Sequence, residues 1–130
     1  MKNEMKKKGS ILVVDDDPDI GTMLKMMLEY KGYAVTLLSN AGQTVQILGN
    51  GVTDIVILDM LIAGINGTDI CRSIRSNPLS ATIPVLMISA LSDARNTCID
   101  AGANDFIAKP FEIEEILAKV NNLVHELSSP

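Results

Sequence analysis

The stretch that decides the fold is Ile11–Asp17, which reads Ile-Leu-Val-Val-Asp-Asp-Asp: four apolar residues followed directly by three aspartates. Three later apolar runs also end on a polar residue, namely Ile55–Leu58 before Asp59, Val85–Ile88 before Ser89, and Phe106–Ala108 before Lys109. Short runs of this kind are typical of strands buried on both faces of a parallel sheet. The carboxyl ends of adjacent parallel strands meet at one edge, where open α/β folds bind ligands. We therefore expect carboxylates, a hydroxyl and an amine to face one pocket.

Length and composition indicate one globular domain with an aliphatic core. The chain has 130 residues, 47% of them hydrophobic, 21% charged and only 3% aromatic, which argues against disorder. The net charge of −5 disfavours direct binding to nucleic acid. The lysines near the start of the chain precede an apolar run of only four residues, too short for a signal peptide or a membrane span. Cys71 and Cys98 lack metal-ligand spacing and are expected to be reduced structural thiols, which favours the cytoplasm.

Strand-like runs alternate with segments of helical period, a pattern that predicts βαβ units. We expect five strands, near residues 10–14, 33–37, 54–58, 83–88 and 105–108. Helices should fill the gaps. The first starts at Pro18 and ends at Gly32, and the last has apolar positions from Ile113 to Leu127. Shorter helices are expected between them at Asn40–Leu48, Thr68–Arg75 and Ser92–Ala101. The predicted fold class is α/β: a doubly wound, five-stranded parallel sheet of flavodoxin-like order 2-1-3-4-5, with helices on both faces. Residues 1–9 are interpreted as a basic flexible leader, 10–127 as the domain and 128–130 as a tail or linker stub.

The clustered carboxylates indicate a metal site, although a single aspartate at a strand end is more often a helix cap. Two unit charges 4 Å apart in partly desolvated surroundings repel by about 4 kcal/mol, so they must be protonated, paired or neutralised by a cation. Mg²⁺ prefers oxygen ligands, which Asp16 and Asp59 could supply. A carboxylate can attack phosphorus to give an aspartyl phosphate, with Lys109 as the fixed cation and Ser89 as a hydrogen-bond donor.

With these motifs the chain resembles the receiver domain of two-component response regulators, in particular single-domain, chemotaxis-regulator-like receivers. The resemblance covers residues 10–127. It rests on motifs in the family's order and approximate spacing: the acidic run after the first strand, Leu58-Asp59-Met60, Gly67, Ile88-Ser89-Ala90 and Lys109-Pro110-Phe111. The resemblance implies a phosphoacceptor switch of a phosphorelay, which catalyses only its own phosphorylation and dephosphorylation and is otherwise not an enzyme.

The resemblance also assigns roles to single residues. Asp59 would accept a phosphoryl group from a phosphohistidine on a partner. Mg²⁺ would be bound directly by Asp16, through water by Asp15, and by the backbone carbonyl of Leu61. Lys109 would contact the acylphosphate, and its bond to the following proline is often cis in this family.

The switch is expected to involve Ser89 and Phe106. Ser89 would move to bond a phosphoryl oxygen, and Phe106 would turn into the vacated space and change the surface formed by the fourth helix, fifth strand and fifth helix. The alternative for Phe106 is an ordinary core aromatic.

Two leucines near the acceptor are candidates for tuning the lifetime of the phosphorylated state. Leu61 and Leu91, two residues beyond Asp59 and Ser89, offer no polar side chain to orient an attacking water, so hydrolysis is expected to be slow. The alternative is that both leucines merely cover the pocket. Where the family often has Pro and Asp after the acceptor, this chain has Ala63 and Asn66, which we interpret as a change in loop stiffness.

The expected partners are proteins. The single histidine, His125, lies far along the sequence from every site residue, so a separate histidine kinase or histidine phosphotransfer protein is expected as the donor. A downstream protein target is expected, without nucleic acid and without membrane insertion, and a phosphorylation-dependent dimer is a further form that the resemblance allows.

Three alternative functions were considered. A receiver-fold interaction module that works without phosphorylation is the main alternative. A haloacid-dehalogenase-type phosphohydrolase would need Thr or Val at Asp19 and a substrate cap, and a flavodoxin-type carrier would need a phosphate loop where this chain has three aspartates.

Overall fold

The computed structural model describes residues 8–62 and 64–128. Residues 1–7 of the predicted leader, residues 129–130 of the predicted tail, and Ala63 lie outside the described residues. In chain order the elements are β1 (Ser10–Val14), α1 (Pro18–Tyr30), β2 (Ala34–Leu38), the 3₁₀ turn η1 (Ala41–Gln43), α2 (Thr44–Leu48), β3 (Ile55–Asp59), β4 (Leu61–Ile62), β5 (Ile65–Asn66), α3 (Gly67–Ser76), β6 (Val85–Ser89), α4 (Arg95–Asp100), β7 (Asp105–Ala108) and α5 (Ile113–Ser128).

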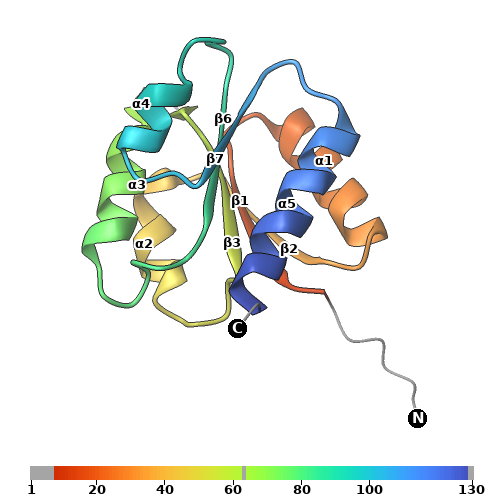
Figure 1. Cartoon of the computed structure of the whole chain (residues 1–130), viewed down its shortest axis with the longest axis horizontal. Helices are drawn as coiled ribbons and strands as arrows, with labels where there is room; N and C mark the ends of the chain where they lie inside the picture. Colours follow the sequence, from red (N-terminus) through yellow and green to blue (C-terminus); the bar gives the residue numbers. More distant parts are fainter. Residues whose placement is uncertain (1–7, 63, 129–130) are drawn as a thin grey trace.

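Five parallel strands form one sheet in the order β2-β1-β3-β6-β7, which is the predicted order 2-1-3-4-5 (Figure 1). The fold class predicted from the sequence is therefore confirmed. Strands β4 and β5 form a separate antiparallel pair, in which Leu61 lies opposite Asn66. This hairpin was not predicted, because strands of two residues carry no recognisable hydrophobic period.

The sheet lies between two helical layers, and alternate residues of each strand face one or the other. In β1, Ile11 and Val13 pack with the α1 and α5 layer, whereas Leu12 and Val14 pack with the α2, α3 and α4 layer. Figure 1 shows these two groups of helices on opposite sides of the strands. Both cores are almost entirely aliphatic, as the composition predicts, and they hold the carboxyl ends of the strands in one row.

Helix ends follow local chemistry. Asp17 caps α1 by accepting hydrogen bonds from the backbone N–H groups of Asp19 and Ile20, Pro18 occupies the first helical position, and Gly32 ends the turn with φ +103°. The predicted helix at Asn40–Leu48 is a 3₁₀ turn followed by a five-residue helix. The predicted helix at Ser92–Ala101 is only Arg95–Asp100, and its N-cap residue, Ala94, makes no side-chain cap hydrogen bond.

Cys71 and Cys98 are free and buried, and burial raises the pKa of both thiols. Among the described residues, none of the helices is both long and apolar enough to cross a membrane.

Candidate functional site

A cavity of about 440 Å³ opens at the carboxyl edge of the sheet. Its walls come from the ends of β3, β6 and β7 and from the β4–β5 hairpin: Asp59, Met60, Leu61, Asn66, Ser89, Ala90, Leu91 and Lys109. The structure therefore brings the polar ends of three predicted strands together in one cavity. Hydrogen bonds that continue the sheet fix this arrangement, since the Met60 N–H donates to the Ile88 carbonyl at 2.8 Å and the Lys109 N–H donates to the Ser89 carbonyl at 2.7 Å.

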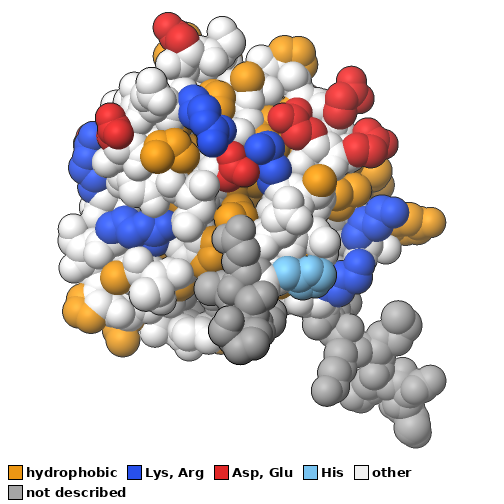
Figure 2. All heavy atoms as spheres, in the orientation of Figure 1, with side chains coloured by type: hydrophobic (Ala, Val, Ile, Leu, Met, Phe, Trp, Pro, Cys, Tyr) orange, Lys and Arg blue, Asp and Glu red, His pale blue; other side chains and the backbone are white. Residues whose placement is uncertain are grey.

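Three carboxylates gather beside this cavity. Oxygens of Asp15, Asp16 and Asp59 lie within 4.8 Å of one another. Asp59 is 7% exposed and Asp15 is 9% exposed, whereas Asp16 faces solvent. The Lys109 ammonium lies 3.0 Å from Asp59 Oδ2 and 3.9 Å from Asp15 Oδ2, so one lysine is shared by two largely buried carboxylates. Figure 2 shows acidic side chains in the upper half of this face, several of them toward the right and near lysine or arginine side chains.

The repulsion between these carboxylates and their burial change the pKa of Asp15. Burial and the neighbouring Asp59 charge raise the pKa of Asp15 to about 6, although the Asp17 N–H, which donates to Asp15 Oδ1 at 2.9 Å, and the Lys109 ammonium both favour the charged form. A single lysine therefore does not compensate two buried carboxylates. A cation at the cluster would relieve the repulsion.

The third aspartate of the acidic run has a different role. Asp17 caps α1 with its side chain and is not a member of the carboxylate cluster. The cap reading considered for single aspartates thus holds for Asp17, while Asp15 and Asp16 lie at the site as predicted.

Two backbone N–H groups donate to side-chain oxygens that line the cavity. The Leu61 N–H donates weakly to Asp59 Oδ1 at 3.4 Å, and the Leu91 N–H donates to Ser89 Oγ at 3.0 Å. The Ser89 side chain is almost fully buried. Because its oxygen accepts from the backbone, its hydroxyl hydrogen remains available for another acceptor.

The remaining predicted residues are placed as follows. The side chains of Leu61 and Leu91 are 66% and 60% exposed and line the cavity rim. Phe106 is buried in the core on the α2, α3 and α4 side, next to the strand that carries Ser89. The Lys109–Pro110 peptide bond is cis. His125 lies exposed on α5.

Two site residues had roles that the sequence analysis missed. Asn66 caps α3 by accepting hydrogen bonds from the Thr68 N–H at 3.0 Å and the Thr68 hydroxyl at 2.7 Å, and it also lines the cavity. Gly67 passes so close to β3 that an added Cβ would overlap the Asp59 carbonyl oxygen and lie 2.9 Å from Met60 Cα. The pattern Asn-Gly-Thr before a helix was a detectable cap signal. The close approach at Gly67 had no signal beyond the glycine itself.

The donor set suits a hard divalent cation. Three carboxylates at the carboxyl edge offer oxygen ligands, and Asp16 is accessible from solvent. Mg²⁺ needs only one or two protein carboxylates and keeps several of its waters, which an open, acidic edge permits.

Comparison with known proteins assigns the chain to a family. Residues 11–121 match the family described as the response regulator receiver domain. The chain belongs to this receiver-domain family of two-component systems. It is 36% identical over 116 residues to the uncharacterized transcriptional regulatory protein YkoG of Bacillus subtilis, which covers 88% of this chain and 50% of YkoG. It is 34% identical over 120 residues to the response regulator MprA of Mycobacterium sp. (strain KMS), covering 91% of this chain and 51% of MprA. This receiver chain thus spans about half the length of these relatives.

Solved structures of response regulators and receiver domains have the same fold as this chain. A putative response regulator from Chloroflexus aurantiacus superimposes with a TM-score of 0.84 and 34% identity, covering 90% of this chain and 98% of that one. The receiver domain of the sensor histidine kinase PA1611 from Pseudomonas aeruginosa PAO1 superimposes with a TM-score of 0.81 and 29% identity over 90% of this chain and 98% of that one. The PA1611 structure is described with a magnesium ion coordinated in its active-site cleft.

Proposed function

We propose that this receiver is a phosphorylation-controlled switch in which Asp59 takes a phosphoryl group from a phosphohistidine on a separate histidine kinase or histidine phosphotransfer protein. One observation carries the proposal. The Asp59 carboxylate lies at the cavity, 3.0 Å from the Lys109 ammonium and beside the carboxylates of Asp15 and Asp16.

The transfer is a displacement at phosphorus. A carboxylate oxygen of Asp59 forms the new P–O bond, the P–N bond to the donor imidazole breaks, and the imidazole leaves. Lys109 balances the charge on the transferring group, because its ammonium already lies against the acceptor oxygen. The Ser89 side chain, whose oxygen now accepts from the Leu91 N–H, moves toward the phosphoryl group and donates its hydroxyl hydrogen to a phosphoryl oxygen.

The carboxylates of Asp16 and Asp59, the Leu61 carbonyl, and Asp15 through water are the proposed ligands of Mg²⁺. When bound, Mg²⁺ supplies positive charge that offsets the carboxylate cluster and the phosphoryl oxygens.

The proposed readout passes through β7 to the helices beside it. Asp105, on β7, accepts from Arg95 of α4 at 3.2 Å and from Lys119 of α5 at 3.1 Å. Burial alone would raise the pKa of Asp105, but the Phe106 N–H and these two cations lower it, so the carboxylate stays charged and holds both helices. A shift of Ser89 and Phe106 would therefore alter the α4–β7–α5 surface.

The proposed output is a bound protein in the cytoplasm, or a phosphorylation-dependent dimer of this chain. Related regulators such as MtrA of Mycolicibacterium smegmatis are described as DNA-binding, but this chain matches only 48% of MtrA. Its net charge of −5 disfavours direct contact with DNA through the receiver itself.

Intact-mass analysis after incubation with acetyl phosphate tests the proposal, with and without Mg²⁺. The wild type is expected to gain one phosphoryl group only with Mg²⁺, and Asp59→Ala is expected to gain none. Asp69→Ala, an exposed aspartate on α3, is the matched control and should label like the wild type. A folded wild type that gains no phosphoryl group with Mg²⁺ would favour an interaction module that works without phosphorylation.

A further inference from the structure

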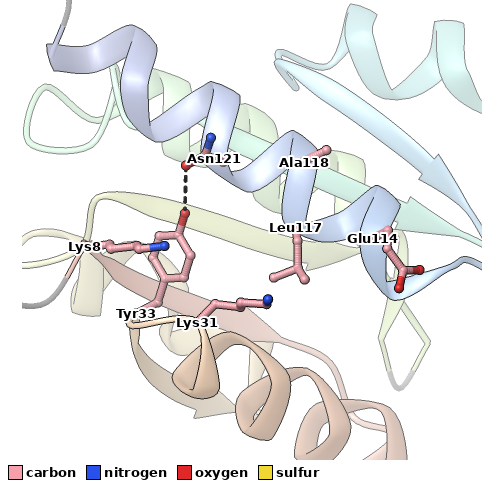
Figure 3. A pocket seen from close by; sticks show the side chains of 7 residues that line it. All are labelled: Lys8, Lys31, Tyr33, Glu114, Leu117, Ala118 and Asn121. Carbon is pink, nitrogen blue, oxygen red and sulfur yellow. Dashed lines mark hydrogen bonds between the residues drawn. The ribbon is translucent and has the colours of Figure 1, made fainter.

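A second hollow, away from the cavity at Asp59, lies between α5 and the turn that joins α1 to β2 (Figure 3). This groove has a volume of about 350 Å³, and its walls include Lys8, Lys31, Tyr33, Glu114, Leu117 and Asn121. It shares no residue with the cavity around Asp59, so the proposed phosphotransfer does not use it.

The position of Lys8 is fixed by the backbone. Its N–H donates to the Gly32 carbonyl at 2.9 Å, which aligns the residue with the start of β2. The aliphatic stem of Lys8 crosses Gly32, where an added Cβ would lie 3.4 Å from Lys8 Cγ. The Lys8 ammonium then lies 5.8 Å from the centre of the Tyr33 ring, a cation–π distance. This cation is therefore held against the groove wall.

A second cation comes from the end of α1. Figure 3 shows the Lys31 side chain extended along the groove below Leu117. Within the described part of the chain, no carboxylate forms an ion pair with Lys8 or with Lys31. Two ammonium groups thus line one groove without a partner of opposite charge from the described residues.

The rest of the wall is apolar or hydrogen-bonded. Tyr33 is only 2% exposed, and its hydroxyl donates to Asn121 Oδ1 in a long hydrogen bond of 3.5 Å. Leu117 adds a partly buried aliphatic surface, and Glu114 places one negative charge at the far end of the groove (Figure 3). Along the groove, Figure 3 shows Lys8 beside Tyr33, then Lys31 below Leu117, and then Glu114.

We propose that this groove binds an acidic peptide segment of a partner protein. A carboxylate of the segment lies between the ammonium groups of Lys8 and Lys31, and its methylene stem lies against Tyr33 and Leu117. A donor group further along the segment meets Glu114. A lysine ammonium group is a compact charge that can donate hydrogen bonds to one carboxylate. It lacks the planar, bidentate geometry with which an arginine guanidinium binds phosphate.

Charge over the whole molecule favours a short peptide over an extended polyanion. A nucleic acid or an anionic membrane would reach beyond the groove and meet a chain of net charge −5. A segment confined to the groove meets two cations and one anion instead. The groove volume accommodates a few side chains, which matches a peptide contact.

Fluorescence anisotropy with a short fluorescein-labelled peptide that carries one glutamate followed by one lysine, at low salt, tests the proposal on the full chain. Lys31→Glu and Lys8→Glu are each expected to weaken binding by about tenfold. Arg72→Glu changes the net charge equally on α3 and is expected to leave the affinity within about twofold of wild type, because Arg72 is exposed and lies outside the groove. Asp59→Ala should bind like the wild type, which separates this proposal from the phosphotransfer proposal.

Backbone amide shifts in the ¹⁵N-labelled protein locate the contact, and they are expected at Tyr33 and Asn121 rather than at Ser89. The proposal is overturned if the peptide does not bind, if Arg72→Glu weakens binding as much as Lys31→Glu, or if the shifts cluster at the Asp59 cavity. Tighter binding of a single-stranded oligonucleotide or of phosphatidylserine vesicles than of the peptide would also overturn it.

Discussion

The two edges of the sheet use similar groups to opposite effect. At the amino edge, side-chain oxygens cap strand N–H groups: Asp54 Oδ2 accepts from Ser10 and Asn104 Oδ1 accepts from Val85, both at 2.8 Å. At the carboxyl edge, Asp15 and Asp59 are largely buried and share one lysine. Buried polar side-chain atoms have hydrogen-bond partners at both edges within the described residues, but at the carboxyl edge two carboxylates compete for one ammonium group. The difference teaches that the side chains of Asp54 and Asn104 complete the strand hydrogen bonds at the amino edge, whereas the carboxyl edge carries surplus negative charge that a cation can neutralise.

Arg75, at the end of α3, is the main hydrogen-bond donor on the β6–β7 side of the amino edge. Its guanidinium donates to the carbonyls of Gly102 at 2.9 Å and Ile83 at 2.6 Å and to Asn104 Oδ1 at 2.7 Å, with a weaker bond to Ala81. These bonds tie α3 to the segments that lead into β6 and β7.

The largest effect is expected from Arg75→Ala. Loss of several charge-assisted hydrogen bonds to partly buried acceptors should lower the free energy of unfolding by about 3 kcal/mol. Urea denaturation measures this change. Arg72→Ala, three residues earlier on the same helix, removes only an exposed ion pair with Asp69 and should cost less than about 0.5 kcal/mol. Equal decreases in the free energy of unfolding for Arg75→Ala and Arg72→Ala would show that the hydrogen bonds of Arg75 at the amino edge add no special stability.

The second effect is steric and lies at the carboxyl edge. Gly67→Ala places a methyl group against the Asp59 carbonyl and Met60 Cα, so the free energy of unfolding should fall by about 2 kcal/mol. Gly21→Ala is the matched control, because its Cβ would meet only Leu37 at 3.7 Å and alanine favours a helix. Thermal denaturation should show Gly21→Ala unchanged or more stable. A Gly67→Ala variant as stable as wild type would show that the approach of α3 to β3 tolerates a side chain.

The third prediction is a stabilising substitution: Asp15→Asn, at the carboxyl edge, should raise the free energy of unfolding. The folded-state pKa of Asp15 is raised to about 6 from 3.8, so the stability that this group contributes is fully present below pH 3.8 and is lost as the pH rises through 6. Asp15→Asn removes that loss. The variant should match wild type near pH 4 and exceed it by about 2 kcal/mol at pH 8 without Mg²⁺, at 1.36 kcal/mol per pKa unit and with some relaxation allowed.

Denaturation curves at both pH values measure the Asp15→Asn effect, and added Mg²⁺ should narrow the gap by stabilising the wild type more than the variant. A variant less stable than wild type at pH 8 would show that the carboxylate cluster is not a source of repulsion.

The smallest predicted effect is on the hydrolysis rate of the acylphosphate and concerns Leu61, at the exposed rim of the cavity beside Asp59. Leu61→Asn supplies a polar group beside the acceptor, so the acylphosphate should hydrolyse about three- to tenfold faster, a change of about 1 kcal/mol in the barrier. Loss of the phosphoryl adduct over time by mass spectrometry gives the rate. Leu79→Asn, at an equally exposed leucine away from the site, should leave it unchanged. An unaltered rate in Leu61→Asn would mean that Leu61 only covers the cavity.

The residues at the carboxyl edge could be predicted from the sequence because the pattern that marks them lies within a few consecutive residues. Each polar residue there directly follows an apolar run, so Asp59, Ser89 and Lys109 could be placed at strand ends from those runs alone. The amino edge depends on contacts between distant segments, such as Arg75 with Asn104, which leave no pattern in either segment. The β4–β5 hairpin was missed for a related reason, because four residues cannot show a period.

The identity of the acceptor is the central claim, and chemical mapping tests it most directly. The protein is phosphorylated with acetyl phosphate and Mg²⁺, reduced with borohydride, which converts an aspartyl phosphate to homoserine, and digested for tandem mass spectrometry. The account predicts homoserine at position 59 with Asp15 and Asp16 unchanged. Homoserine at another aspartate, with Asp59 intact, would contradict it.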